Sequence, residues 1–363
     1  MALEFAQRIR RIPVYPVASG YDLGEQVTML ASNESCFGPL PEVVEAASRM
    51  LPGSNRYPDP AYSPLRRALA DRYGVAPERV ALGNGSCDIL LAAGEALLEP
   101  GAELVYAWPA FSVYPHVAAC TGARAIEVPL DDQERHDLDT IASVITVATR
   151  LVLICNPNNP TSTAVDLEDV KQFLDRVPSH VCVILDEAYA EYSLKLGDTY
   201  ASVELLRRWP NLVVLRTFSK VYGLAGLRAG YALCGSPEMR TAIDQVRQPF
   251  HLNAAAQAAA VEALRHQDEV ERRVTQTLAS RMSLLDGISS LGLWVAESDA
   301  NFVWVRLPET DDGPQESEVV SGLLEHGVLV RAGTSLGREG ALRVTVGTDS
   351  ENERFLAALA EVI

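Results

Sequence analysis

Several features that mark other protein classes are missing from this 363-residue sequence. The six cysteines form no Cys-x-x-Cys pair, and several lie in apolar, strand-like runs, which indicates reduced thiols and no disulfide framework. The six histidines lack metal-ligand spacing, so we expect no metal. No apolar run approaches a membrane span, and the first stretch, MALEFAQRIRRIP, lacks the apolar core of a secretory signal. We therefore expect a cytoplasmic protein with no membrane partner.

Positive charge is also scarce. The chain has 31 Lys and Arg residues against 48 Asp and Glu residues, a formal net charge of -17, which would repel a phosphate backbone and argues against a nucleic-acid partner. An anionic substrate would need arginines gathered at one place. Hydrophobic residues make up 48% of the chain, so it should fold throughout, and its length exceeds the usual limit of one hydrophobic core.

The order of the expected elements predicts an α/β protein of two domains. Between about residues 60 and 235, short β-branched runs alternate with helix-length segments, as in a mainly parallel sheet covered on both faces. A second α+β pattern follows residue 255. We expect an N-terminal arm that joins the small domain (residues 1–45), a large domain (46–250) and a small C-terminal domain (251–363).

Polar residues directly follow four of the strand-like runs. They are residues 84–88 after RVALG, 156–161 after TRLVLIC, Asp186 after VCVIL, and Ser219 and Lys220 after LVVLRTF. In open parallel sheets, ligands bind at the carboxyl ends of the strands. We therefore expect these four segments to form one site.

Lys220 and Asp186 carry the strongest chemical signal. Lys220 has the hydroxyls of Thr217 and Ser219 before it and Arg228 after it, a set that suits an aldehyde cofactor with a phosphate, although a lysine in a loop is as often simply solvated. Asp186 ends an almost wholly apolar strand, where a carboxylate needs a positive partner. A protonated pyridine nitrogen would serve, and so would a core arginine.

Three further segments could complete such a site. Tyr189 could bond a ring oxygen or merely pack, and the prolines of CNPNNPTS could present the Asn159 amide. In GNGSCD, the N–H groups of Gly85, Ser86 and Cys87 would hold a phosphate at a helix start. The rival interpretation, a dinucleotide site, needs G-x-G-x-x-G, and the sequence does not meet that pattern.

Taken together, these segments resemble a known family. From about residue 12 to its end, the sequence is similar to the fold-type I aminotransferases that depend on pyridoxal 5'-phosphate (PLP), and most of all to the histidinol-phosphate aminotransferases and their aromatic-aminotransferase relatives. The matching stretches are LASNESCFGPLP, NRYPDP, LGNGSCD, CNPNNPT, LDEAYAEY, TFSKVYGLAGLRAGY, ANFVWV, GVLVR and LRVTVGTDSENERFL. The resemblance implies a large domain with a mainly parallel seven-stranded sheet and a smaller α+β domain.

The resemblance also implies roles around the cofactor ring. Lys220 would hold PLP as a Schiff base, and Asp186 would pair with the pyridine nitrogen. Tyr189, the third catalytic residue, would bond the ring oxygen together with Asn159. Phe111 would stack on the ring.

The cofactor phosphate and the substrate would be held by further residues. The phosphate ligands implied are Gly85, Ser86, Thr217, Ser219 and Arg228, with Cys87 at the same helix start and Tyr57 reaching in from a second subunit, so a homodimer with shared active sites is implied. Arg343 would bind the substrate carboxylate, and Arg331 a distal phosphate or acidic tail. Asn33 and Tyr15 would line the substrate pocket.

The substrate is left open by the sequence. We expect histidinol-phosphate:2-oxoglutarate aminotransferase activity, in histidine biosynthesis, with a phenylalanine or tyrosine aminotransferase as the alternative. A PLP decarboxylase of a phosphorylated amino acid shares most of the cofactor residues. The chain also departs from the family at Ser35-Cys36, Cys87-Asp88 and Ser162. The first of these lies near the expected substrate side, so it bears on substrate identity.

Overall fold

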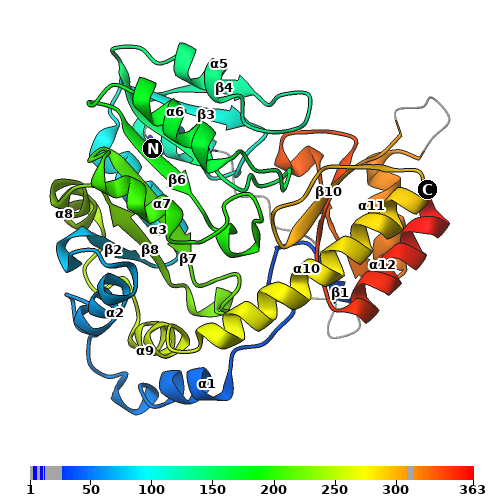
Figure 1. Cartoon of the computed structure of the whole chain (residues 1–363), viewed down its shortest axis with the longest axis horizontal. Coiled ribbons are helices and arrows are strands. Elements are labelled where there is room, and N and C mark those ends of the chain that lie inside the picture. Colours follow the sequence, from blue (N-terminus) through cyan, green and yellow to red (C-terminus); the bar gives the residue numbers. More distant parts are fainter. Residues whose placement is uncertain (1–2, 6–8, 11, 13–26, 309–313) are drawn as a thin grey trace.

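The computed structural model describes residues 3–5, 9–10, 12, 27–308 and 314–363. The chain forms a large unit around one extensive sheet and a smaller unit at its side, and the long helix α10 (Gln267–Ser290) runs from the first toward the second (Figure 1). Of the helices in the described part of the chain, none is both long and apolar enough to cross a membrane. Tyr15 lies outside the described residues.

The large sheet has seven strands in the order β2-β8-β7-β6-β5-β3-β4. The strands are β2 (Val80–Gly83), β3 (Glu103–Trp108), β4 (Arg124–Pro129), β5 (Thr149–Cys155), β6 (Cys182–Asp186), β7 (Leu212–Thr217) and β8 (Gly230–Cys234). Only β8 runs against its neighbours, β2 and β7. The expected mainly parallel seven-stranded sheet is therefore confirmed, and each of its strands falls within a β-branched run of the sequence.

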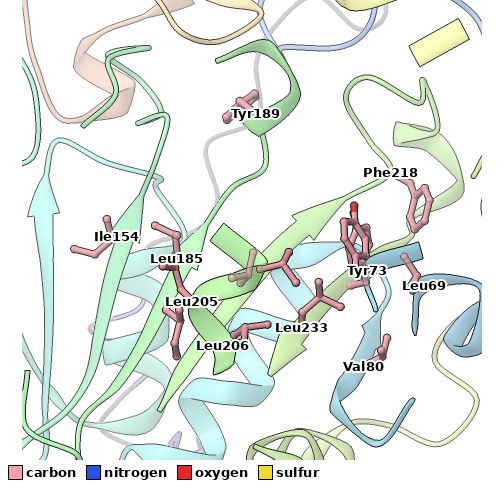
Figure 2. Packing of buried hydrophobic residues seen from close by; sticks show 14 of the residues in the cluster. Leu69, Tyr73, Val80, Ile154, Leu185, Tyr189, Leu205, Leu206, Phe218 and Leu233 are labelled. Atoms are coloured by element: carbon pink, nitrogen blue, oxygen red, sulfur yellow. The ribbon is translucent and has the colours of Figure 1, made fainter. Parts of the chain in front are cut away.

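Apart from the largely exposed edge strand β4, the sheet is buried on both faces, because most side chains of its strands are apolar. Successive strand side chains point to opposite faces, so Val152 and Ile154 join one core while Leu151 and Leu153 join another. Figure 2 shows part of the first core, where Leu69 and Tyr73 of α2 lie near strand side chains. Helices α3, α4 and α8 cover one face, and α2, α5, α6, α7 and α9 cover the other.

The helices of the large unit differ in length but share this packing. They are α1 (Pro41–Ser48), α2 (Ser63–Tyr73), α3 (Ser86–Leu97), α4 (Tyr114–Thr121), α5 (Leu138–Ser143), α6 (Leu167–Arg176), α7 (Ala201–Glu204), α8 (Pro237–Val246) and α9 (Ala254–Ala263). The alanines of α9 pack into the large core, against α1 and α2. We therefore propose that the division between the domains lies at α10, beyond residue 251.

The small unit has its own core and its own sheet, in the order β12-β13-β10-β9. Its elements are β9 (Trp294–Val295), β10 (Phe302–Arg306), α11 (Glu316–Glu325), β11 (Val328–Leu329), β12 (Arg331–Ala332), β13 (Ala341–Thr345) and α12 (Asp349–Val362). The early strand β1 (Thr28–Met29) pairs in parallel with β11. The N-terminal segment thus joins the small unit and then passes beside the carboxyl ends of the large sheet, where Ala31, Ser32 and Asn33 line a cavity.

Candidate active site

A cavity of about 260 Å³ lies where the large sheet meets the small unit. It gathers residues from all four polar segments that follow the strands, and also from the N-terminal segment and the small unit. The predicted site residues that line it are Asn33, Ser86, Cys87, Phe111, Asn159, Asp186, Tyr189, Thr217, Ser219, Lys220, Arg228, Arg331 and Arg343. The sequence therefore predicted correctly that these segments converge.

Asp186 lies at the carboxyl end of β6 and is buried. Burial raises the pKa of its carboxyl group to about 6, against the lowering effect of a hydrogen bond from the Tyr114 hydroxyl. No ion pair within the described chain involves Asp186. A carboxylate in this position favours a cationic group in the cavity.

The core arginine that could have neutralised Asp186 pairs with its neighbour instead. The Arg216 Nη2 atom lies 2.6 Å from Glu187 Oε2, and both side chains are only 1% exposed. The Ser202 hydroxyl also donates a hydrogen bond to Glu187. This pair belongs to the side of the sheet covered by α7, whereas the Asp186 carboxyl bonds α4 on the other side. The positive partner of Asp186 therefore has to come from a ligand.

Lys220 follows β7, and its Nζ atom donates a hydrogen bond to the Ser32 carbonyl at 3.0 Å. The amine also lies over the Tyr189 ring, 5.5 Å from its centroid. Burial, and then the nearby Arg343 guanidinium, lower the pKa of Lys220 to about 7. A large fraction of this amine is therefore uncharged near neutral pH and able to attack a carbonyl carbon.

Tyr189 and Asn159 are held by residues of other segments. The Asn33 side-chain amide donates to the Tyr189 hydroxyl at 3.1 Å. Arg343 donates to Asn159 Oδ1 at 2.6 Å and to the Ala31 carbonyl. The N-terminal segment, the large sheet and β13 therefore meet in one hydrogen-bonded network around the cavity.

Two arginines of the small unit face the same cavity. Arg331 on β12 is the register partner of Arg343 on β13. Side chains of directly paired residues lie on the same face of a sheet, with Cβ atoms about 5 Å apart. This pairing, which the sequence alone did not reveal, puts two guanidinium groups into one pocket.

The start of α3 provides an anion site. Gly85, at the N-cap, has φ +83, and a side chain there would collide with the Arg228 guanidinium. The Gly85 N–H, which we expected to be a phosphate donor, instead donates to the Gly83 carbonyl at 2.8 Å, so the donors left at the helix start are those of Ser86 and Cys87. Together with the Arg228 side chain, they suit a phosphate dianion. Arg228 is held by the Ala225 carbonyl at 3.1 Å, and the Ser219 N–H donates to the Thr217 hydroxyl.

Tyr57 stands apart from this cavity. Its side chain is 81% exposed and stacks on Phe250, with ring centroids 4.4 Å apart. Neither aromatic ring lines the pocket of its own chain.

Sequence reasoning missed several residues at the cavity, and four of them show which signals were available. Glu34, Ser112 and Leu336 line its wall, and Tyr114 contacts Asp186 from behind. Glu34 and Ser112 are adjacent to predicted site residues, so their positions could have suggested them. For Tyr114, the available signal was a tyrosine in an apolar segment, whose hydroxyl needs a buried partner.

The family model for aminotransferase class I and II matches residues 25–359. The chain belongs to the class I and II aminotransferases. The resemblance stated from the motifs is thereby confirmed, and the protein is a PLP-dependent transaminase of fold type I.

Individual aminotransferases are similar over nearly the whole chain. An aromatic amino acid aminotransferase of Thermobifida fusca is 45% identical over 90% of this chain and 88% of its own length. Histidinol-phosphate aminotransferase 1 of Cupriavidus pinatubonensis is 44% identical over 97% of this chain and 92% of its own. The crystal structure of histidinol-phosphate aminotransferase from Sinorhizobium meliloti, in complex with PLP, superimposes with a TM-score of 0.88 at 30% identity, covering 100% of this chain and 98% of that one.

The residues present fit PLP. The cofactor offers a basic ring nitrogen, an aldehyde and a phosphate, and the cavity presents a buried carboxylate without a cation, a largely neutral amine and a helix start with an arginine. When bound, PLP supplies an aldehyde that captures amines and a ring that withdraws electrons from the substrate's α-carbon.

Gly230→Ala tests the anion site at α3. A Cβ on Gly230 would lie 2.6 Å from the carbonyl carbon of Gly85, which is backbone and has no room to yield. We expect the start of α3 to shift and the PLP dissociation constant, measured by titrating the cofactor-free enzyme, to rise about tenfold or more. Gly226→Ala is the matched control, since nothing lies within 4 Å of a Cβ there. Unchanged PLP affinity in Gly230→Ala would show that this helix start does not hold the phosphate.

The pH dependence of cofactor capture tests the lowered pKa of Lys220. Only the neutral amine attacks an aldehyde, so the rate of PLP capture by the cofactor-free enzyme should rise as the pH passes about 7 and then level off. Free lysine mixed with PLP provides the correction for the titration of the cofactor itself. A rate that keeps rising up to about pH 10, as for an ordinary lysine, would contradict the structure. Lys220→Ala should show no capture.

Proposed function

We propose that this aminotransferase transfers an amino group between histidinol phosphate and 2-oxoglutarate. The supporting observation is that Arg331 and Arg343, from paired strands, line one cavity with Lys220. Glutamate and 2-oxoglutarate carry two carboxylates, and histidinol phosphate carries a phosphate. Two guanidinium groups can bind either kind of substrate in bidentate geometry.

The cofactor ring is held by groups at the sheet edge. Lys220 would hold PLP covalently. Once the amino group of the substrate has replaced it on the cofactor, the freed neutral amine of Lys220 would take the proton from the substrate's α-carbon. Asp186 keeps the ring nitrogen protonated. Tyr189 and Asn159 bond the ring oxygen, and Phe111 stacks on the ring.

The remaining predicted residues bind the phosphate and the substrate. The phosphate ligands are Ser86, Cys87, Thr217, Ser219 and Arg228, and Gly85 serves as the turn before the helix, because its N–H donates to the Gly83 carbonyl. Arg343 binds the α-carboxylate of glutamate, and Arg331 binds the distal anion. Asn33 lines the substrate side through its contact with Tyr189, and Tyr15 is assigned to the same pocket by its sequence position alone. The protein acts in amino-acid biosynthesis in the cytoplasm.

An aromatic amino-acid aminotransferase is the second candidate. Relatives of both names are similar to the chain at almost equal identity. The cavity wall also offers apolar surface from Phe111, Tyr189 and Leu336, against which an aromatic side chain could pack.

We also propose that two chains share their active sites through Tyr57. An exposed stacked pair of rings, outside its own pocket, fits a residue that a second copy covers. In this arrangement, the Tyr57 hydroxyl contacts the cofactor phosphate of the partner.

Half-reactions on PLP-loaded protein separate the two substrates. Mixed with histidinol phosphate or glutamate, the enzyme should convert rapidly to the amine form of the cofactor, as followed by absorbance, and phenylalanine should react slowly. The reverse order would make the protein an aromatic aminotransferase. No conversion by any of the three would contradict both assignments.

Arg331→Gln refines the same experiment. Loss of one charge-assisted contact should lower kcat/KM for histidinol phosphate and glutamate about tenfold to a hundredfold, and that for phenylalanine much less. Arg207→Gln is the control, because Arg207 is exposed, pairs with Glu204 and does not line the cavity. An equal loss of kcat/KM for all three amino donors would show that Arg331 does not bind the distal anion.

Mixing two variants tests the shared site. Tyr57→Ala and Lys220→Ala are each defective, but a hybrid dimer would combine the intact Lys220 of one chain with the intact Tyr57 of the other. Activity should therefore recover on mixing, toward about a quarter of the wild-type value for random exchange of subunits. If Tyr57 served its own chain, no site in the hybrid would be complete and mixing would restore nothing.

A further inference from the structure

Tyr114 contacts the carboxylate of the site but does not line the cavity. Its side chain is fully buried at the start of α4, and its hydroxyl donates a hydrogen bond to Asp186 Oδ2 at 3.0 Å. The other oxygen, Oδ1, accepts only a longer bond of 3.3 Å from the Ala188 N–H. Among the described residues, Tyr114 is the one side chain that donates a hydrogen bond to Asp186.

The other groups around Asp186 either favour its protonated form or make no hydrogen bond that would stabilise its charged form. The Glu187 carboxylate raises the pKa of Asp186, in addition to the larger effect of burial. Cys155 of β5 lies close by, but its thiol donates to the Pro157 carbonyl. Cys87 and Tyr189 are near neighbours that donate no hydrogen bond to the carboxyl group. The Tyr114 hydroxyl is therefore the main support of the charged form within the protein.

The Tyr114 ring is fixed in place by its neighbours. It packs edge-on against Tyr106 of β3 and against Phe111, with ring centroids 5.9 Å apart in each case. Burial holds the pKa of the Tyr114 hydroxyl well above its usual value, so it stays protonated and can only donate its hydrogen to the more acidic partner. The direction of the hydrogen bond is thus set by the packing.

We propose that Tyr114 is a positioning residue that orients Asp186 and keeps it ionised, so that the proton between Asp186 and the cofactor resides on the ring nitrogen. This proposal rests on the assignment of Asp186 to the ring nitrogen made above. A hydrogen bond to a carboxylate lowers its basicity. A less basic Asp186 leaves the proton with the ring, which is the state that withdraws electrons from the α-carbon.

Tyr114→Phe removes the hydroxyl and keeps the ring packed against Tyr106 and Phe111. Tyr106→Phe is the matched control. The Tyr106 hydroxyl is also buried and donates to a carboxylate, Glu127 Oε1, at 2.9 Å. Neither Tyr106 nor Glu127 lines the cavity. Both variants lose one tyrosine hydroxyl from β3 or the helix beside it. They differ in whether the lost hydrogen bond reaches Asp186.

The protonation of the cofactor is read directly from the ring-nitrogen resonance of PLP labelled with nitrogen-15. In Tyr114→Phe, we expect this resonance to move toward the position of the unprotonated ring, and the PLP dissociation constant to rise. With glutamate, kcat should fall about tenfold or more while KM stays within about twofold of wild type. Tyr106→Phe should match the wild type in all four measurements.

Asp186→Asn separates failure of this proposal from failure of the site assignment. If Asp186→Asn shifts the resonance and Tyr114→Phe does not, the site stands and the role of Tyr114 is overturned. If Tyr106→Phe reproduces the effects of Tyr114→Phe, those effects come from general loosening of the packing, and the proposal is again overturned. If Asp186→Asn leaves the resonance unchanged, Asp186 does not pair with the ring nitrogen. Both the assignment of Asp186 and the role of Tyr114 are then overturned.

Discussion

The rest of the site depends on one electrostatic constraint, the burial of the Asp186 carboxylate at the end of an apolar strand. Transfer of an unpaired carboxylate into a protein interior costs several kcal/mol. The fold places an arginine close by but directs it to Glu187, and gives Asp186 only a tyrosine hydroxyl and a weak backbone donor. The remaining stabilisation has to come from a cationic group in the cavity, a role that we propose for the protonated ring nitrogen of the cofactor.

The substrate side depends on how the two units meet. Arg343 and Arg331 belong to the small sheet, yet Arg343 bonds Asn159 in the loop that follows β5 of the large sheet. A second link holds the units together, in which the buried Glu134 of the large unit forms ion pairs with two arginines of the small one, Arg306 and Arg338. The position of Arg331 and Arg343 relative to Lys220 thus depends on the contact between the units.

Residues adjacent to strand ends could be predicted from the sequence, because an apolar β-branched run fixes where its strand stops. Lys220, Asp186 and Asn159 were found in this way. The residues that contact them were harder to predict from the sequence. Tyr114 bonds Asp186 although the two residues are 72 positions apart. Arg331 lies beside Arg343 because of the register of β12 with β13, which the sequence does not reveal. The division at α10 that we propose was equally hard to predict, since an alanine-rich helix such as α9 carries no pattern that tells which core it joins.

The departures from the family pattern bear differently on function. Ser162 adopts φ +61 in a buried turn, a conformation that costs about 1 kcal/mol in a residue other than glycine. Its carbonyl accepts a hydrogen bond from the Asp299 N–H, which helps to hold that turn against the segment before β10. Ser35 and Cys36 lie outside the cavity that Lys220 lines, on the other side of the N-terminal segment. If the proposed function holds, we expect substrate choice to depend on residues such as Arg331, Leu336 and Ser112, because those side chains, and not the altered pair, line the cavity beside Lys220.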